Sequence, residues 1–171
     1  MKTRNTLACF AVSLLGLTMC AVPSQAADKK ISGTVSSTLT LTQDSELVGD
    51  VTCTVAGAPC IAFGAPNITL RLNGFTMTGT IPGCTPDTSF NDGIDVIQQN
   101  DATILGPGLI KKFGGFGVFL ASESGVKIRG ITVTDSCFSG IFLGSVTESE
   151  IEGNTSVRNS MGSEGGPCGG T

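Results

Sequence analysis

The stretch Gly117-Val118-Phe119-Leu120 returns 23 residues later as Gly140-Ile141-Phe142-Leu143. Further along the chain, Ile104, Ile128 and Ile151 follow one another at spacings of 24 and 23 residues. A fixed period in this range is typical of repeat proteins, in which one unit cannot bury its apolar face alone. We therefore expect successive repeats to stack, with equivalent aliphatic side chains forming ladders through the interior.

Short alternating runs of apolar and polar residues, bounded by Gly, Asn or Asp, dominate the chain, and helix signals are sparse. Such runs are typical of strands with one buried face, and they occur at residues 38–42, 68–72, 126–129 and 131–134. Each repeat holds about three of them. The pattern predicts an all-β, right-handed parallel β-helix, a solenoid of 22–24-residue coils with three short strands per coil.

The two ends of the predicted solenoid differ. Residues 27–60 are expected to form an irregular N-terminal coil that caps the stack, and residues 61–160 the coils themselves. Residues 161–171 are rich in Gly and cannot cover the last coil. Because a bare solenoid end exposes apolar surface and strand edges, we expect a longer β-helix or end-to-end self-association.

The first 26 residues have the features of a signal peptide. Lys2 and Arg4 precede an apolar run over residues 7–19, and Ser24-Gln25-Ala26 follows as a small-x-small cleavage pattern. The run is too short to span a bilayer core of about 30 Å. We expect cleavage after Ala26 and a secreted protein, located outside the cell, in the periplasm or in the cell envelope.

The charge balance disfavours nucleic acid as a partner. Without Lys2 and Arg4 the chain has 8 basic and 14 acidic residues, a net charge of −6, and it has neither Trp nor Tyr. Nucleic-acid-binding domains instead carry a basic stripe or patch.

Five cysteines follow the signal peptide, and an oxidising compartment would allow disulfides. Cys53 and Cys60 enclose a short loop with Gly and Pro and form the favoured pair. Cys137 and Cys168 are a second pair at neighbouring turns, which leaves Cys84 without an assigned partner.

Several segments resemble the right-handed β-helix proteins of the pectin-lyase-like superfamily. The resemblance extends over roughly residues 45–160 and is carried by residues 67–74, 100–108, 125–133 and 151–155. It implies the β-helix fold, and the superfamily includes polysaccharide lyases, hydrolases and epimerases. The matching residues are those of packing and turns, so the resemblance specifies a fold more closely than an activity.

One phrase, Asn91-Asp92-Gly93-Ile94-Asp95, resembles the strand that carries the catalytic aspartate of polygalacturonases. The resemblance makes Asp92 and Asp95 the catalytic candidates. Glycoside hydrolysis needs a second carboxylate across the scissile bond, and the equivalent positions of the next coils hold neither a carboxylate nor a histidine. A turn before a strand, with Asn and Asp chosen for its geometry, is the favoured interpretation.

A lyase would need a basic residue near the substrate, and the candidates for substrate binding are Lys111, Lys112, Lys127 and Arg129. Lys127 and Arg129 alternate with Val126 and Ile128, as on the solvent face of a strand. Calcium is a minor alternative because carboxylates occur in several turns. No metal site is assigned.

Phenylalanines gather in the later repeats and allow two interpretations. They either form a platform on which a sugar stacks or pack within the protein, and packing is favoured because Trp and Tyr, with their polar handles, are absent. The residues are Phe113, Phe116, Phe119, Phe138 and Phe142.

These observations lead us to expect an exported, non-catalytic scaffold with polysaccharide as its partner. A polysaccharide lyase or glycoside hydrolase with part of its site outside this chain is the first alternative. A truncated remnant without activity is the second.

Overall fold

A computed structural model describes residues 27–80, 84 and 90–160 of the protein, and in this part of the chain all regular structure is β-strand. Five strands form one sheet: β2 (Leu39–Leu41), β4 (Ile61–Phe63), β7 (Ile94–Ile97), β9 (Val118–Ala121) and β11 (Ile141–Gly144). Eight form the other: β1 (Lys29–Val35), β3 (Ser45–Cys53), β5 (Thr69–Arg71), β6 (Thr76–Gly79), β8 (Thr103–Lys111), β10 (Lys127–Thr134), β12 (Glu150–Glu152) and β13 (Thr155–Val157).

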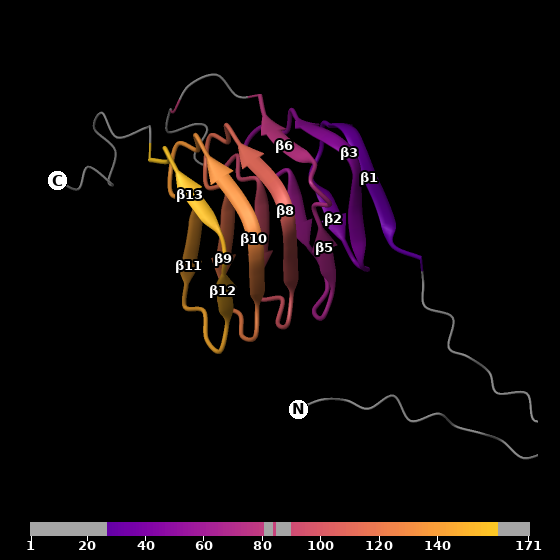
Figure 1. Cartoon of the computed structure of the whole chain (residues 1–171), viewed down its shortest axis with the longest axis vertical. Helices are drawn as coiled ribbons and strands as arrows, with labels where there is room; N and C mark the ends of the chain where they lie inside the picture. Colours follow the sequence, from indigo (N-terminus) through magenta and orange to yellow (C-terminus); the bar gives the residue numbers. More distant parts are fainter. Residues whose placement is uncertain (1–26, 81–83, 85–89, 161–171) are drawn as a thin grey trace, which may run out of the picture.

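All the strand pairs are parallel, and the chain visits the two sheets alternately. It leaves a strand of the five-stranded sheet, enters the eight-stranded sheet, and then returns to lie beside the strand of the previous repeat. Figure 1 shows the result, with β1 at one end of the stack and β11, β12 and β13 at the other. No helix able to span a membrane occurs among the residues that the structure describes.

The strand registers confirm the repeat seen in the sequence. In the five-stranded sheet Val118 pairs with Ile94 on one side and with Ile141 on the other. In the eight-stranded sheet Ile128 lies between Ile104 and Ile151 in the same way. Both predicted aliphatic ladders are therefore present.

The core lies between the two sheets and follows these ladders. Ile94, Val118, Ile104 and Ile128 are fully buried, as the alternation of apolar and polar residues along each strand requires. Burial decreases at the far end of the stack, where Ile151 is 37% exposed. The last repeat thus receives cover from one side only among the described residues.

The expected three strands per repeat are not found throughout. The second and third strands are separate as β5 and β6 and as β12 and β13, but they are continuous in β8 and β10. The register shifts between Arg129 and Ile131, where Gly130 has a φ of 68°. A Cβ on Gly106 would collide with the carbonyl of Gly130. Glycine at both positions lets the sheet bend there without losing its strand pairing.

The N-terminal repeat is irregular. Lys29 pairs with Ser45 and Gly33 with Val51, so β1 and β3 are offset by 16 to 18 residues rather than by about 23. Between β4 and β7 the offset grows to 33 residues, because the chain carries an insertion between β6 and β7. Residues 81–83 and 85–89 of this insertion are outside the described part of the chain.

Asparagine side chains join neighbouring repeats at the turns. The Asn154 amide accepts a hydrogen bond from Ile131 N–H and donates one to the Ile128 carbonyl. Asn159 bonds in the same way to Ser136 N–H and the Val133 carbonyl. The turn positions that the sequence marked with Asn therefore satisfy backbone groups that the strand ladders leave free.

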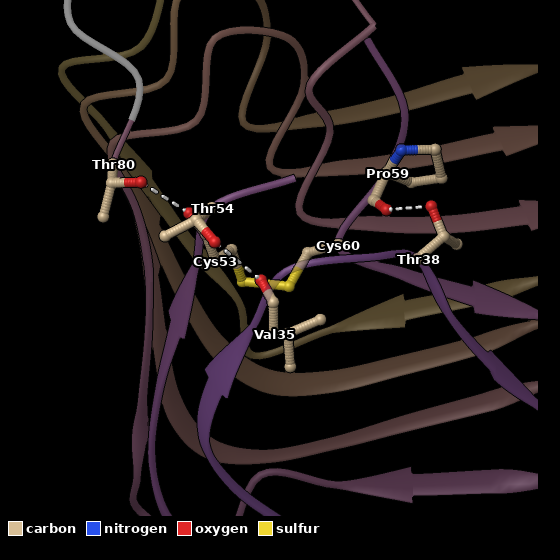
Figure 2. The surroundings of a disulfide bond; sticks show 7 residues. All are labelled: Val35, Thr38, Cys53, Thr54, Pro59, Cys60 and Thr80. Carbon is tan, nitrogen blue, oxygen red and sulfur yellow. Dashed lines mark hydrogen bonds between the residues drawn. A yellow bond between two sulfur atoms is a disulfide. The ribbon is translucent and has the colours of Figure 1, made fainter. Parts of the chain in front are cut away.

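Two disulfides link turns and loops of the stack. Cys53 is bonded to Cys60, as favoured from the sequence, and Figure 2 shows this bond beside β1 and β3. The Thr54 hydroxyl donates to the Val35 carbonyl, and the Thr80 hydroxyl donates to the Cys53 carbonyl. The loop between the two cysteines is thereby held against the first repeats.

The second disulfide corrects a prediction. Cys137 is bonded to Cys84 and not to Cys168. The insertion between β6 and β7 carries Cys84 to the turn before β11, a route that a repeat of constant length does not anticipate. Cys168 lies outside the described residues. Disulfides persist in oxidising compartments, so both bonds are compatible with an extracellular environment.

Candidate functional site

The outward face of the five-stranded sheet carries one row of side chains that crosses all five strands. In register from the first repeat to the last, the row is Thr40, Ala62, Asp95, Phe119 and Phe142. The residues on either side of each row position point inward, because side chains alternate along a strand. Small residues at one end thus give way to an acid and then to two aromatic rings.

Four phenylalanines form a contiguous group at the aromatic end of this row, and we call them the aromatic cluster: Phe116, Phe119, Phe138 and Phe142. The Phe116 ring centroid lies 5.3 Å from that of Phe119, 5.3 Å from that of Phe138 and 4.9 Å from that of Phe142. Phe119 and Phe142 are stacked, with an interplanar angle of 4°. Phe142 is 38% exposed, so part of the cluster faces solvent.

Asp92 and Asp95 lie beside the aromatic cluster and contact each other; we call them the acid pair. Their carboxyl groups are close enough for each to influence the pKa of the other. Asp92 Oδ1 also accepts the backbone N–H of Phe116 at 2.5 Å. Asp92 is 7% and Asp95 8% exposed. The acid pair is therefore buried and directly bonded to the backbone of one member of the cluster.

Burial dominates the electrostatics of the acid pair. It raises the pKa of Asp92 to about 6, although the Phe116 N–H and the hydrogen bond from Asp95 act in the opposite direction. Burial, followed by the charge of Asp92, raises the pKa of Asp95 to about 8. Both shifts favour protonation of the acid pair, because two adjacent buried carboxylates do not readily carry two charges.

Asp95 has a further unusual feature. Its Oδ1 is buried and has no hydrogen-bond partner among the described residues. Its neighbours in the row are Ala62 and Phe119, neither of which has a polar side chain. An unpaired polar atom in such surroundings costs free energy, so this position is not chosen for stability.

The residues around Asp92 hold it in place from both neighbouring repeats. The Asn91 side chain accepts the backbone N–H of Gly57, and its carbonyl accepts that of Gly115 at 3.1 Å. A Cβ on Gly93 would collide with the Gly117 carbonyl, so glycine is required by close packing. The Asn-Asp-Gly stretch is thus built into the stack and is more than a solvated turn.

A small cavity of about 10 Å³ lies next to Asp92. It is lined by Cys53, Val55, Ala58, Cys60, Gly79, Asn91, Asp92, Phe113 and Gly114. This volume is near the minimum for one water molecule. A sugar ring cannot enter it, so any ligand of this region must bind on the outward face.

The structure does not bring the basic candidates to the acid pair. Lys111, Lys127 and Arg129 belong to β8 and β10 of the eight-stranded sheet, and Lys112 directly follows β8. Arg129 forms ion pairs with Glu150 and Glu152 on the next strand. These four residues therefore belong to a different sheet from Asp95.

Glu123 is a buried acid that the sequence did not single out. It lies in the turn between β9 and β10, is 3% exposed, and neither carboxyl oxygen has a hydrogen-bond partner among the described residues. Burial raises its pKa to about 7. Glu123 sits among polar turn residues, Ser122 and Ser124, and nothing in this local sequence indicates that it is buried.

No group of three or more His, Cys, Asp or Glu side chains in the described ranges could hold a metal ion. The chain matches no protein-family model, no curated protein and no solved structure. The arguments about its function therefore depend on the geometry of the chain itself.

Proposed function

We propose that this protein is an exported, non-catalytic scaffold that binds an uncharged polysaccharide through the aromatic cluster. The fold we propose for it is a right-handed parallel β-helix of the pectin-lyase-like type. Parallel pairing between successive repeats and asparagine bonds at the turns support this fold. The right-handed sense follows the rule that about 98% of parallel crossover connections are right-handed.

The aromatic cluster is the observation that carries the proposed function. Two of its four rings, Phe119 and Phe142, are in register on the outward face of one sheet, and Phe142 is exposed there. A flat apolar ring gains by covering the apolar face of a sugar, because both surfaces leave water together. Strands about 4.8 Å apart repeat this contact along the stack, which suits a polymer better than a single sugar.

The charge around the cluster favours an uncharged ligand. The acid pair is the nearest ionisable group in the outward row, and the net charge of the whole chain is −4. The basic residues that would attract a uronate lie on the other sheet. A polyuronate would therefore meet like charge without a compensating cation.

The geometry of the acid pair supports binding rather than hydrolysis. Glycosidases keep their two carboxyl groups about 5 to 9.5 Å apart so that a substrate or water fits between them. Asp92 and Asp95 are both buried, and each influences the pKa of the other. This arrangement leaves no room for a scissile bond.

Export and the chain boundaries belong to the same proposal. Two disulfides within the described residues fit an oxidising location outside the cell. The signal peptide at residues 1–26 and the tail at residues 161–171 remain predictions from the sequence, since both lie outside the described residues.

Affinity electrophoresis of the exported, oxidised chain would test the proposal. The gels would contain hydroxyethyl cellulose, xyloglucan or polygalacturonate, and we expect retardation by an uncharged polymer but not by the uronate. Phe142→Ala should reduce this retardation about tenfold, a loss of about 1.4 kcal/mol, which is reasonable for one stacking ring.

Val48→Ala is the matched control, because Val48 is an exposed apolar residue of the eight-stranded sheet. It should leave binding unchanged. Equal losses in both variants, or shortening of polygalacturonate by the wild-type protein, would contradict the proposal.

A further inference from the structure

We propose that the proton shared by the acid pair holds the aromatic cluster in its binding arrangement, so that polysaccharide binding is lost when this proton leaves. The inference rests on the function proposed above and adds its regulation. The acid pair would act as a pH-dependent switch: the face binds in mildly acidic surroundings and releases its ligand in alkaline ones.

A direct hydrogen bond connects the acid pair to the cluster. Asp92 Oδ1 accepts the Phe116 N–H at 2.5 Å, and the Phe116 ring contacts each of the other three rings. Phe116 is thus the centre of the cluster. A displacement of the Asp92 carboxylate changes the position of this centre and, through it, of the exposed Phe142.

Loss of the proton creates two like charges that no neighbouring cation compensates in the part of the chain that the structure describes. The elements packed around Asp95 present Ala62 from β4 and Phe119 from β9. The segments around Asp92 present Phe113 and Cys60, and Cys60 does not titrate because it is disulfide-bonded. No cationic side chain from these described elements faces the acid pair.

Two adjacent carboxylates in such surroundings cannot both remain ionised and buried. The second ionisation therefore requires the carboxyl groups to separate and at least one to reach water. Asp95 lies on the outward face, in register with Phe119 of the next strand, and we infer that it reaches water on that face. Hydration of Asp95 thus competes directly with the packing of the cluster.

The pH range over which the switch operates follows from the environment of the acid pair. Burial raises the pKa of Asp92 to about 6 and that of Asp95 to about 8. The acid pair keeps at least one proton below this interval and loses its last one above it. We therefore expect the ordered cluster below about pH 6 and the opened one above about pH 8.

Fluorine NMR of the full chain labelled with para-fluorophenylalanine would test the switch without any ligand. Signals of the cluster would be assigned with single Phe→Leu variants. We expect the cluster signals to shift together between about pH 6 and pH 8. In Asp95→Asn, which keeps the shape but removes the second ionisation of the acid pair, this joint shift near pH 8 should be absent.

Glu123→Gln is the matched control, since Glu123 is a second buried acid with a raised pKa, outside the acid pair. It should leave the titration of the cluster unchanged. A titration that persists in Asp95→Asn, or that disappears in Glu123→Gln, would overturn the proposal.

Binding of hydroxyethyl cellulose at about pH 5.5 and pH 8.5 separates the switch from the function. The wild type should bind about tenfold more weakly at the higher pH, and Asp95→Asn should bind equally at both. If binding does not change with pH, the proposed switch is overturned and the proposed function still stands. A cluster that titrates while no polysaccharide binds would overturn the function, and with it the regulatory role of the switch.

Discussion

The outward surfaces of the two sheets carry different kinds of side chain at equivalent positions of successive repeats. On the eight-stranded sheet one row runs Lys30, Glu46, Arg71, Leu105, Arg129 and Glu152 in register. Its charges largely alternate in sign and lie in solvent, where Arg129 pairs with Glu150 and Glu152. The row on the five-stranded sheet has a single acid, Asp95, followed by aromatic rings.

The comparison shows why only one of these faces is a candidate site. In exposed ion pairs between neighbouring repeats each charge has an opposite partner, and such pairs contribute little to stability. In the acid pair Asp92 accepts a backbone N–H, whereas one oxygen of Asp95 lacks a partner among the described residues. Unfavourable arrangements of this kind tend to mark function.

The largest expected losses of stability come from truncating inward-facing residues, and these losses should be similar in the two sheets. Ile94 of β7 and Ile128 of β10 are both fully buried. Ile94→Ala and Ile128→Ala should each reduce the free energy of unfolding by about 2–5 kcal/mol, because each leaves a cavity. Chemical denaturation would measure both losses. If one variant lost much less than the other, the two sheets would not share one core.

Asp95→Asn should show the next largest effect, and it should depend on pH. The folded protein keeps the Asp95 proton up to about pH 8, whereas the unfolded chain releases it near the ordinary value of 3.8. Wild-type stability therefore falls as the pH rises through this interval. The variant should be more stable than the wild type at about pH 8, by an amount on the order of 2–4 kcal/mol, and nearly equal at pH 4.

Asp135→Asn supplies the opposite control. Asp135 is partly exposed, and its hydrogen bond with Arg158 lowers its pKa. Its contribution to stability is present at neutral pH and is lost only in acid, so this variant should gain nothing at pH 8. Thermal melts across the pH range would check both variants, and a similar gain in both would contradict the account of Asp95.

Glu123→Gln should have a smaller effect of the same sign. Burial raises the pKa of Glu123 to about 7, although this residue lies in a turn outside both sheets. We expect a gain on the order of 1–3 kcal/mol at pH 8 that disappears towards pH 4. Melting temperatures at the two pH values would measure it. A loss of stability at pH 8 would show that the carboxylate has a compensating partner.

Arg129→Ala should have the smallest effect. The Arg129 side chain is exposed, and its ion pairs with Glu150 and Glu152 are surrounded by solvent. Such pairs are screened by salt and contribute little, so the melting temperature should hardly change and should depend little on added salt. A marked loss would mean that the charged row is as important to the stack as the core.

Much of the stack could be predicted from the sequence, because its signals are local or periodic. The aliphatic ladders follow from the 23-residue spacing, and Cys53 and Cys60 are separated by a loop of only six residues. The Cys84–Cys137 bond could not be predicted, since an insertion of irregular length sets the position of Cys84. The continuity of β8 and β10 was also missed, because glycine and proline between two runs usually indicate a break.

Only part of the candidate site could be predicted from the sequence. The sequence identifies Asp92 and Asp95 as candidates within one short segment, but alternation along a strand predicts that the Asp95 side chain is exposed to solvent. The structure buries it at 8% exposure between its neighbours in the row. The phenylalanines were seen as a group, whereas their register with Asp95 and the bond from Phe116 to Asp92 depend on residues one repeat apart.

By itself, the sequence determined that this protein stacks parallel strands at a spacing of about 23 residues and which side chains face the interior. Periodicity suffices for this, because every repeat meets a near copy of itself. Only the tertiary structure decided that Asp92 and Asp95 are buried, that Glu123 is buried, and that Cys137 joins Cys84. Burial and bonding across repeats depend on how far each turn and insertion brings the chain back, and no local pattern encodes that distance.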